Sequence, residues 1–254
     1  MRKSSWALSA AAAGAAVAVL AVPTITTDRS HGDTAVTAVT VNNGKPILLG
    51  PQKAMTFPLV VEARDDSGIR SVDPVGVWGP NYGVLKVGPM RCTASSATES
   101  VCRGTVTVDP VEKQIFNDEA GTWFVDLQVK ANDGDRYVAK TAGGFSLKRA
   151  AKLSGSGVPA EAKAGQKITA QGWLARAFWS DNRFHGYKDG VAYLQFRPEG
   201  SHRWTTVAKA VSTGSGTVKA TVTVAGPGDF QWYAPGDKWT GDAVSAEMPV
   251  AGGR

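Results

Sequence analysis

The sequence predicts an all-β protein with two antiparallel β-sandwich domains in tandem after a signal peptide. Three observations predict this class. Helical periodicity is nearly absent after the first 21 residues, apolar and polar residues alternate in several short segments, and turn sequences rich in Asn, Asp and Gly separate those segments. The length of 254 residues fits two domains of about 100 residues each.

The chain begins with the charge pattern of a secretory signal peptide. Arg2 and Lys3 precede an apolar, Ala-rich stretch that ends at Val22, before the first acid, Asp28. Because this stretch falls short of the ~20 strongly apolar residues that span a bilayer, we expect cleavage after Ala21. An uncleaved membrane anchor is the alternative. The mature protein is therefore expected to be secreted and extracellular, with no membrane attachment.

The first sandwich is expected over residues 39–149, after a flexible leader at 22–38 that shows no strong pattern. Two segments, 57–64 and 123–131, alternate between apolar and polar residues, as half-buried strands do. Asn- and Asp-rich turns lie at 43–44, 66–68 and 132–135. The residues predicted to face inward are Phe57, Leu59, Val61, Ala63, Trp123, Val125, Leu127, Val129 and Ala131.

Cys92 and Cys102 are the two cysteines of the chain. An extracellular location favours a disulfide bond between them, and the polar segment CTASSATESVC is flexible enough to turn back on itself. Two cysteines without nearby histidines make a poor zinc site. We therefore predict a structural disulfide.

The second, aromatic-rich sandwich is expected over residues 150–254, with the boundary inside KRAAK at 148–152. A polar stretch rich in Gly, Ala and Ser precedes a strand that begins at Lys167. Alternation there places Ile168, Ala170 and Leu174 on one face and Trp173 on the other. Further residues predicted to face inward are Ala192, Leu194, Phe196, Val218, Ala220, Val222, Val224, Phe230 and Trp232.

Several segments resemble a known family. VVEARDDSGIRSV is similar to a strand corner of bacterial immunoglobulin-like modules. The order VTVNNGKPILLG, GTWFVDLQVKANDGD and FSLKRAAKL resembles uncharacterised two-domain secreted proteins of high-GC Gram-positive bacteria, some of which are labelled calcium-binding. GVAYLQFRPEGSHRWTTV and GDFQWYAPGD are similar to immunoglobulin-like sandwich modules. The resemblance implies an immunoglobulin-like fold for both domains, and because fold does not imply function it transfers little activity.

The charge of the chain excludes one class of partner. Loss of Arg2 and Lys3 with the signal peptide leaves 26 basic and 22 acidic residues, a net charge of +4. The basic residues are scattered, and no nucleic-acid-binding motif is present. The mature protein is expected to be a monomer that does not bind nucleic acid.

Catalytic signatures are missing from the sequence. There is no Gly-x-Ser-x-Gly elbow and no His-Glu-x-x-His zinc motif, and the chain has three histidines, His31, His185 and His202. We predict that the protein is not an enzyme. The alternative is a secreted hydrolase or hydrolase accessory that uses His185 with Asp181 or Asp189.

Calcium is the metal that the sequence favours, because hard cations prefer clustered carboxylate and carbonyl oxygens. The alternative is that these residues only form tight turns, and no other cofactor is expected. The candidate ligands are Asp65, Asp66 and Asp73 in one turn and Asn132, Asp133 and Asp135 in another. This reading gives a calcium-stabilised extracellular spacer protein.

The segment RAFWSDNRFHGYKDG at 176–190 is predicted to be the loop between the second and third strands of the second sandwich. Its Trp179, Phe184 and Tyr187, with the outward-facing Trp173 and Tyr193, are predicted to contact an extracellular glycan or protein. In the alternative, the loop aromatics cap the sandwich and Trp173 packs under the loop or against the first domain. The leading hypothesis is a secreted, non-catalytic binding or structural module.

Overall fold

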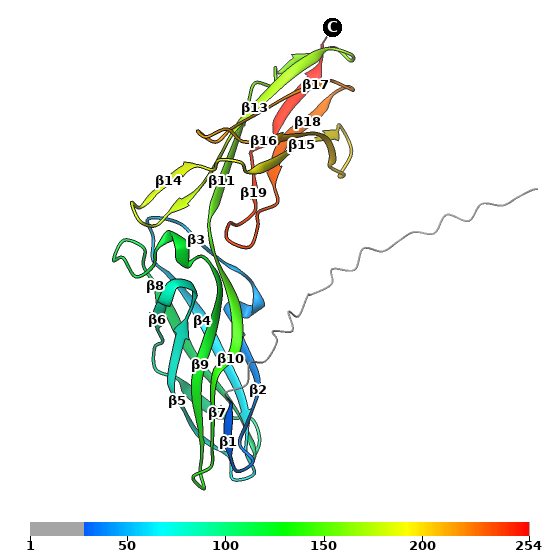
Figure 1. The fold of residues 1–254 in the computed structure, drawn as a ribbon. Helices are drawn as coiled ribbons and strands as arrows, with labels where there is room; N and C mark the ends of the chain where they lie inside the picture. Colours follow the sequence, from blue (N-terminus) through cyan, green and yellow to red (C-terminus); the bar gives the residue numbers. More distant parts are fainter. Residues whose placement is uncertain (1–27, 254) are drawn as a thin grey trace, which may run out of the picture.

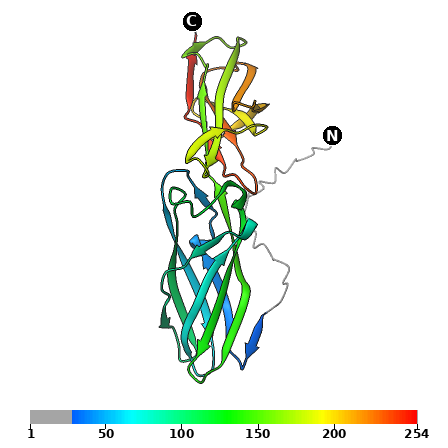
Figure 2. The same cartoon turned by 60° about the vertical axis from the view of Figure 1, so that its left-hand side comes forward.

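The computed structural model describes residues 28–253, which form two β-sandwiches placed end to end (Figures 1 and 2). The predicted signal peptide and residues 22–27 of the predicted leader lie outside this range. Within it, no helix has the length and apolar character needed to cross a membrane. The prediction of an all-β protein is confirmed.

The first sandwich contains ten strands and three single-turn 3₁₀ helices. The strands are β1 (Arg29–His31), β2 (Ala35–Val41), β3 (Ile47–Leu49), β4 (Met55–Arg64), β5 (Ile69–Trp78), β6 (Val84–Lys86), β7 (Arg91–Ala94), β8 (Glu99–Val108), β9 (Gly121–Ala131) and β10 (Arg136–Arg149). The helices are η1 (Asn42–Gly44), η2 (Pro80–Tyr82) and η3 (Asn117–Glu119).

The strand order of the first sandwich is that of an immunoglobulin-like domain. One sheet has the order β2-β4-β8-β7 and the other β1-β10-β9-β5-β6, with β3 parallel to β10. If the main strands are lettered A to G along the chain, these are the A-B-E-D and G-F-C sheets of that fold. The strand order by itself therefore supports the prediction of an immunoglobulin-like fold.

The second sandwich also consists of two sheets. One sheet is β11-β13-β14, with β17 also paired to β13; the other is β12-β20-β18-β15-β16, with β19 paired to β18. The parallel pairing of β12 with β20 corresponds to that of β3 with β10. The strands are β11 (Ala151–Ser156), β12 (Glu161–Ala162), β13 (Lys167–Phe178), β14 (Arg183–Gly186), β15 (Val191–Pro198), β16 (Thr205–Val211), β17 (Thr217–Thr223), β18 (Gly228–Ala234), β19 (Ala243–Val244) and β20 (Met248–Gly252).

The predicted inward faces form the two cores. All nine residues predicted to face inward in the first sandwich are buried, and in the second all are buried except the half-buried Ala220. Trp123 is fully buried, and its Nε1 donates to the Glu119 carbonyl oxygen at 2.8 Å. A Cβ added at Gly79 would lie 2.3 Å from the Trp123 ring, so glycine is required where this chain segment crosses the indole.

The predicted disulfide between Cys92 and Cys102 is confirmed. The two cysteines are directly opposite each other on β7 and β8. The bond therefore joins neighbouring strands of one sheet, whereas the disulfide of antibody domains crosses between the sheets.

The predicted flexible leader is corrected in its second half. β1 pairs with β10, and β2, which begins at Ala35, pairs with β4. The three residues of β1 are exposed. An edge strand whose side chains all face solvent needs no apolar alternation, so the sequence pattern carried no signal for it.

Candidate functional site

The segment at 176–190 is a β-hairpin, which corrects the prediction of a loop. β13 continues to Phe178 and β14 returns from Arg183, with a short turn at 179–182 in which Asn182 has a φ of 59°. In Figure 1 this hairpin projects from the second sandwich towards the first. It belongs to the junction between the domains.

Trp179 lies at the tip of the hairpin and packs into the core of the first sandwich. Its side chain is fully buried there, and Nε1 donates to the Leu49 carbonyl oxygen at 3.1 Å. Its backbone N–H donates to Asn117 Oδ1 at 2.7 Å. The prediction that Trp179 contacts a ligand is therefore wrong, because no part of its ring is accessible.

Asn182 and Lys113 fix the turn of the hairpin to the first sandwich. Asn182 Nδ2 lies 2.9 Å from the carbonyl oxygens of both Pro51 and Pro110. Lys113 Nζ donates to Asn182 Oδ1 at 2.6 Å and to the Ser180 carbonyl at 3.0 Å. The two Asn182 bonds satisfy the carbonyl groups of Pro51 and Pro110, which are buried residues of the first sandwich.

Arg149 also belongs to the junction between the two sandwiches. It is the last residue of β10, it is 5% exposed, and its Nε donates to the Ala177 carbonyl at 2.6 Å. Its guanidinium group lies 4.3 Å from the centre of the Phe178 ring. The Arg149 N–H also donates to the Trp239 carbonyl, so this residue joins β10 to two segments of the second sandwich.

Phe184 also contributes to the junction, whereas Tyr187 packs against the core of the second sandwich. Phe184 packs against the first core, and Lys152 Nζ lies 4.1 Å from its ring centre. The Tyr187 hydroxyl donates to Asp237 Oδ2 at 2.5 Å, and burial, with the neighbouring Asp237 carboxylate, raises its pKa. The expectation that these two rings form an open ligand surface is corrected: both are half-buried.

Trp173 and Tyr193 lie on the outer faces of two different sheets. Trp173 on β13 is 40% exposed, and its Nε1 donates to the Ser215 carbonyl at 2.9 Å. Tyr193 on β15 is half-buried between Lys209 and Tyr233 on the neighbouring strands. The five predicted aromatic residues therefore do not form one surface, and Trp173 presents the most open ring among them.

His185 and Asp181 form an exposed pair on the hairpin. His185 Nε2 lies 2.5 Å from Asp181 Oδ2, and the two side chains are 45% and 48% exposed. The edge of the imidazole packs on the Phe178 ring. Among residues 28–253, the hydrogen bonds of this pair include no serine, threonine or cysteine side chain, so a Ser-His-Asp arrangement is not assembled. Asp189 is 76% exposed and faces Lys188.

The acidic residues predicted to bind calcium come together at the end of the first sandwich away from the second. Two groups share Asp65: Asp33, Asp65 and Asp66, and Asp65, Asp133 and Asp135, each with ligand oxygens within 4.8 Å of one another. Figure 1 shows the β1–β2 and β9–β10 turns at this end. Asp73 lies on β5 outside both groups, and Asn132 Nδ2 donates to the Ser67 carbonyl.

The carboxylates of this acidic cluster have different environments. Burial alone would raise the pKa of Asp65, but hydrogen bonds from Ser67 and Thr34 outweigh it and hold the pKa below its usual value. Partial desolvation and the charges of Asp66 and Asp65 raise the pKa of Asp33. The cluster thus concentrates negative charge. Calcium prefers oxygen ligands, and carboxylate oxygens are common among them.

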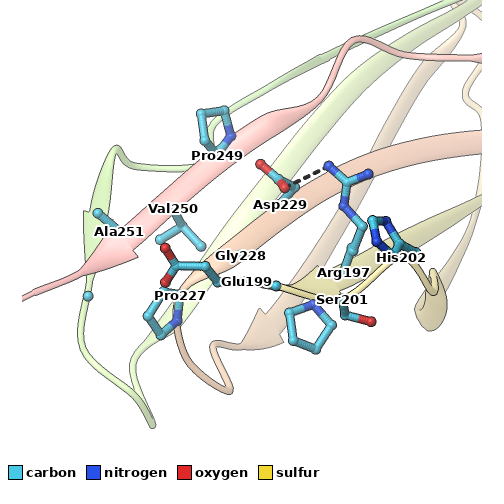
Figure 3. Close-up of a pocket in the computed structure, with 13 residues that line it drawn as sticks. Arg197, Glu199, Ser201, His202, Pro227, Gly228, Asp229, Pro249, Val250 and Ala251 are labelled. Atoms are coloured by element: carbon cyan, nitrogen blue, oxygen red, sulfur yellow. Dashed lines mark hydrogen bonds and ion pairs between the residues drawn. The ribbon is translucent and has the colours of Figure 1, made fainter.

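A hollow of about 780 Å³ lies on the second sandwich. It is bordered by the β15–β16 loop, the β17–β18 turn and β20 (Figure 3). Arg197 Nη2 donates to Asp229 Oδ2 at 2.9 Å and to Glu247 Oε2 at 2.7 Å. The positive charge of Arg197 is therefore balanced by these two carboxylates. His202 also borders the hollow and lies on an exposed loop.

No protein-family description and no curated protein sequence matches the chain. Among solved structures, a DUF4785 family protein from Legionella pneumophila has a TM-score of 0.34 at 13% identity, covering 79% of this chain and 52% of that one. The D00-D0 domain of intimin has a TM-score of 0.29 at 10% identity (84% and 100%). The adhesin InvE of Yersinia pseudotuberculosis has a TM-score of 0.28 at 11% identity (84% and 58%). Similarities this low identify neither a family nor an activity.

Proposed function

We propose that the protein is a secreted, non-catalytic binding or structural module that holds two sandwiches in a fixed relation outside the cell. The insertion of Trp179 into the first core is the observation that carries the proposal. A linker that only tethers two domains leaves them free to move, whereas a buried anchor with its own hydrogen bonds does not.

The disulfide supports the extracellular part of the proposal. Disulfides persist in oxidising compartments and are rare where thiols are kept reduced. Cys102 is fully buried and Cys92 is its directly opposite partner. A protein that depends on such a bond works outside the reducing cytosol.

Trp173 is the contact residue that we propose for a glycan or protein ligand. Its ring is the most open of the predicted aromatic residues, and an indole on a sheet surface offers a flat apolar face for a sugar ring or an apolar side chain. Tyr193 on the opposite sheet provides a second, separate position. Binding through either residue is independent of the junction.

Small-angle X-ray scattering of the mature protein tests whether the two sandwiches keep a fixed orientation relative to each other. One conformation with the two sandwiches end to end should reproduce the curve. Asn182→Ala combined with Lys113→Met should broaden the distance distribution, while Lys209→Met on the outer face of the second sandwich should leave it unchanged. A wild-type curve that only an ensemble of domain orientations can fit contradicts a fixed spacer.

The binding part is tested with a panel of cell-wall and environmental polysaccharides, read by pull-down and tryptophan fluorescence. Trp173→Ala and Tyr193→Ala are compared separately with wild type. Loss of binding in one variant assigns the sheet that carries the contact. If bound polysaccharide is retained by both variants, neither residue carries the contact.

A calcium-stabilised spacer is the second candidate. Acids of two other turns, β1–β2 and β9–β10, converge on Asp65 in the β4–β5 turn. Asp33, Asp65, Asp66, Asp133 and Asp135 would provide the carboxylate ligands. Calcium would screen the mutual repulsion of these groups and hold three turns together. Thermal unfolding in millimolar calcium should then have a higher midpoint than in chelator, and Asp133→Asn should reduce the difference; equal midpoints for wild type exclude this role.

A further inference from the structure

An apolar row crosses four strands on the outer face of the first sandwich, beginning at the edge strand β6 (Figure 1). Val84 on β6, Trp78 on β5, Phe124 on β9 and Gly144 on β10 are direct neighbours in register. Along β5, β6 and β9 the residues on either side of this row are buried, so the row faces away from the core. Val84 is 68% exposed and Trp78 is 36% exposed. The row spans three strand spacings, roughly 14 Å.

The ring of Trp78 is held in one orientation. Its Nε1 donates to the Lys140 carbonyl oxygen at 2.8 Å. The centres of the Trp78 and Phe124 rings are 4.8 Å apart, and the ring planes are inclined by 33°. An aromatic ring that is already fixed loses little conformational entropy when it contacts a ligand.

Tyr82 follows in the η2 turn and is 98% exposed. Its φ is 65°, and that of Asn81 before it is 50°. A left-handed backbone conformation is unfavourable for a side chain of this size, and an exposed ring gains no packing energy in return. Conformations of this kind are concentrated at functional sites, including those that bind ligands.

The turn that carries Tyr82 is itself well fixed. The Gly79 N–H donates to the Gly83 carbonyl at 2.9 Å, and Asn81 Nδ2 donates to the Asp118 carbonyl at 3.1 Å. A Cβ added at Gly83 would lie 2.8 Å from the ring of the buried Trp123. The turn therefore rests on the core and presents its tyrosine in a defined position.

Trp78 and Tyr82 line a hollow of about 510 Å³, which we call the Trp78 hollow. All of its lining residues are uncharged: Trp78, Gly79, Asn81, Tyr82, Gly83 and Val84. On the sheet surface beside Trp78, Lys140 and Asp126 form an ion pair at 2.6 Å and so balance each other. Ligand sites of this volume, with aromatic walls and few polar groups, are common in proteins, and the lack of charge favours an uncharged ligand.

A second hollow of about 510 Å³ adjoins the first at Val84. Thr105, Thr107 and Gln114 provide hydroxyl and amide groups to it, and Lys86 is the one charged residue among its lining residues. The two hollows thus form a continuous path across β6. One end of this path is aromatic, and the other end offers hydrogen-bonding groups.

The size of the path favours a slender ligand over a folded protein. Six residues line the Trp78 hollow and eight line the adjoining one, with Val84 in both. A protein–protein interface of standard size involves about 20 to 30 residues on each side. A linear polymer needs only a narrow path of this kind.

We propose that Trp78 and Tyr82 form a binding site for an uncharged polysaccharide. A sugar ring has an apolar face of C–H groups, which stacks on an aromatic ring, and a rim of hydroxyl groups. One ring of the polymer lies in the Trp78 hollow, and the following rings pass over β6 towards Thr105. This site rests on the proposed function of an extracellular binding module, and it is separate from the contacts proposed at Trp173 and Tyr193.

Soluble hexasaccharides test the site in the mature protein. Cellohexaose, chitohexaose, xylohexaose and maltohexaose are each titrated into isotope-labelled protein, and the indole N–H signals are followed by NMR. Hexagalacturonate, with a carboxylate on each ring, is the anionic reference. At least one neutral hexasaccharide should shift the Trp78 signal in a saturable way, and hexagalacturonate should not. If no neutral hexasaccharide shifts this signal, the proposal is wrong.

The Trp173 signal in the same titrations separates this site from the contact proposed above. Trp78→Phe and Trp173→Phe assign the two signals. A shift of Trp78 alone supports this site and contradicts the contact at Trp173. A shift of Trp173 alone overturns this site and leaves the proposed function intact. Broadening of the Trp78 signal with rising protein concentration, without any sugar effect, shows that the face pairs with a second copy and also overturns the site.

Two variants measure the contribution of the rings. Tyr82→Gly removes the exposed ring and relieves the left-handed conformation. It should weaken affinity about tenfold or more, while the unfolding midpoint stays the same or rises. Asn43→Gly, at a φ of 54° in the exposed η1, is the matched backbone control and should bind as wild type does. Unchanged affinity in Tyr82→Gly overturns the role of this ring.

Trp78→Ala should also weaken affinity about tenfold or more. If this variant fails to fold, Tyr82→Gly decides, because the exposed tyrosine ring contributes nothing to the core. Trp173→Ala is compared in the same assay. Affinity that falls in Trp173→Ala but not in Trp78→Ala or Tyr82→Gly assigns the polysaccharide to the second sandwich and contradicts this proposal.

Discussion

The indole nitrogen of Trp179 donates a hydrogen bond to the carbonyl oxygen of Leu49 at 3.1 Å, across 130 positions of the chain. The donor belongs to a hairpin of the second sandwich and the acceptor to β3 of the first. Ala177 and Trp179 thereby complete the first core. The two domains therefore share buried apolar surface, and their stabilities should be coupled.

Replacement of Trp179 by alanine should lower the free energy of unfolding by about 3 to 5 kcal/mol, the range for removal of a buried aromatic side chain. Calorimetry should also separate the unfolding of the two sandwiches into distinct transitions. Trp173→Ala, on the open face of β13, is the control and should cost about 1 kcal/mol or less. Equal effects of the two substitutions contradict the role of Trp179 as an anchor.

Asn182→Ala should cost about 1 to 3 kcal/mol, because buried carbonyl groups lose their donor. Alanine also tolerates a φ of 59° poorly, so Asn182→Gly separates the two effects. Asn43→Ala, at a φ of 54° in the exposed η1, measures the backbone cost without buried bonds. Chemical unfolding monitored by tryptophan fluorescence gives all three values. A loss in Asn182→Ala no larger than in Asn43→Ala shows that the hydrogen bonds are not stabilising.

Removal of the disulfide should lower the stability of the first sandwich by roughly 2.5 to 3 kcal/mol on the chain-entropy model. The cysteines are separated by ten positions, so the constraint on the unfolded chain is modest. Urea unfolding with and without reductant measures the effect in wild type. The double variant Cys92→Ala and Cys102→Ala should not respond to reductant, and a response there indicates an effect unrelated to this bond.

Acid should destabilise the fold partly through Asp65. Because the folded-state pKa of this carboxyl is lowered, its contribution is present above its unfolded pKa of about 3.9 and is lost as pH falls through the folded value. Unfolding free energies measured in urea from pH 7 to pH 2.5 should therefore decline less steeply in Asp65→Asn. Thr34→Val, which removes one donor to Asp65, should raise the pKa of that carboxyl in an NMR titration; an unchanged pKa argues against this hydrogen bond as a cause.

The faces of the main strands could be predicted from the sequence. The period of two in 57–64 and 123–131 matches the buried residues of β4 and β9, because side chains alternate between the core and the opposite face along a strand. The disulfide was predictable for a related reason: the chain has two cysteines, separated by a short polar segment.

The position of the aromatic residues at 176–190 was not predictable from local pattern. Trp179 and Trp173 are both aromatic residues near the same strand, yet one is fully buried and the other is open to solvent. Their difference depends on contacts of Trp179 with Leu49 and Asn117 of the first sandwich. A local sequence pattern cannot predict contacts with residues so far away in the chain. The junction residues Lys113, Arg149 and Asn182 were missed for this reason.

The sequence by itself determined the strand faces, the paired cysteines and the acidic turns of this protein, since each depends on neighbours within a few residues. Only the tertiary structure decided that the hairpin anchors the second sandwich, that an all-polar strand at 29–31 joins the sheet, and that two distant turns meet at Asp65. The physical reason is that strand alternation is a local property of the backbone. Docking between sandwiches, edge pairing and the convergence of turns depend on which surfaces folding brings together.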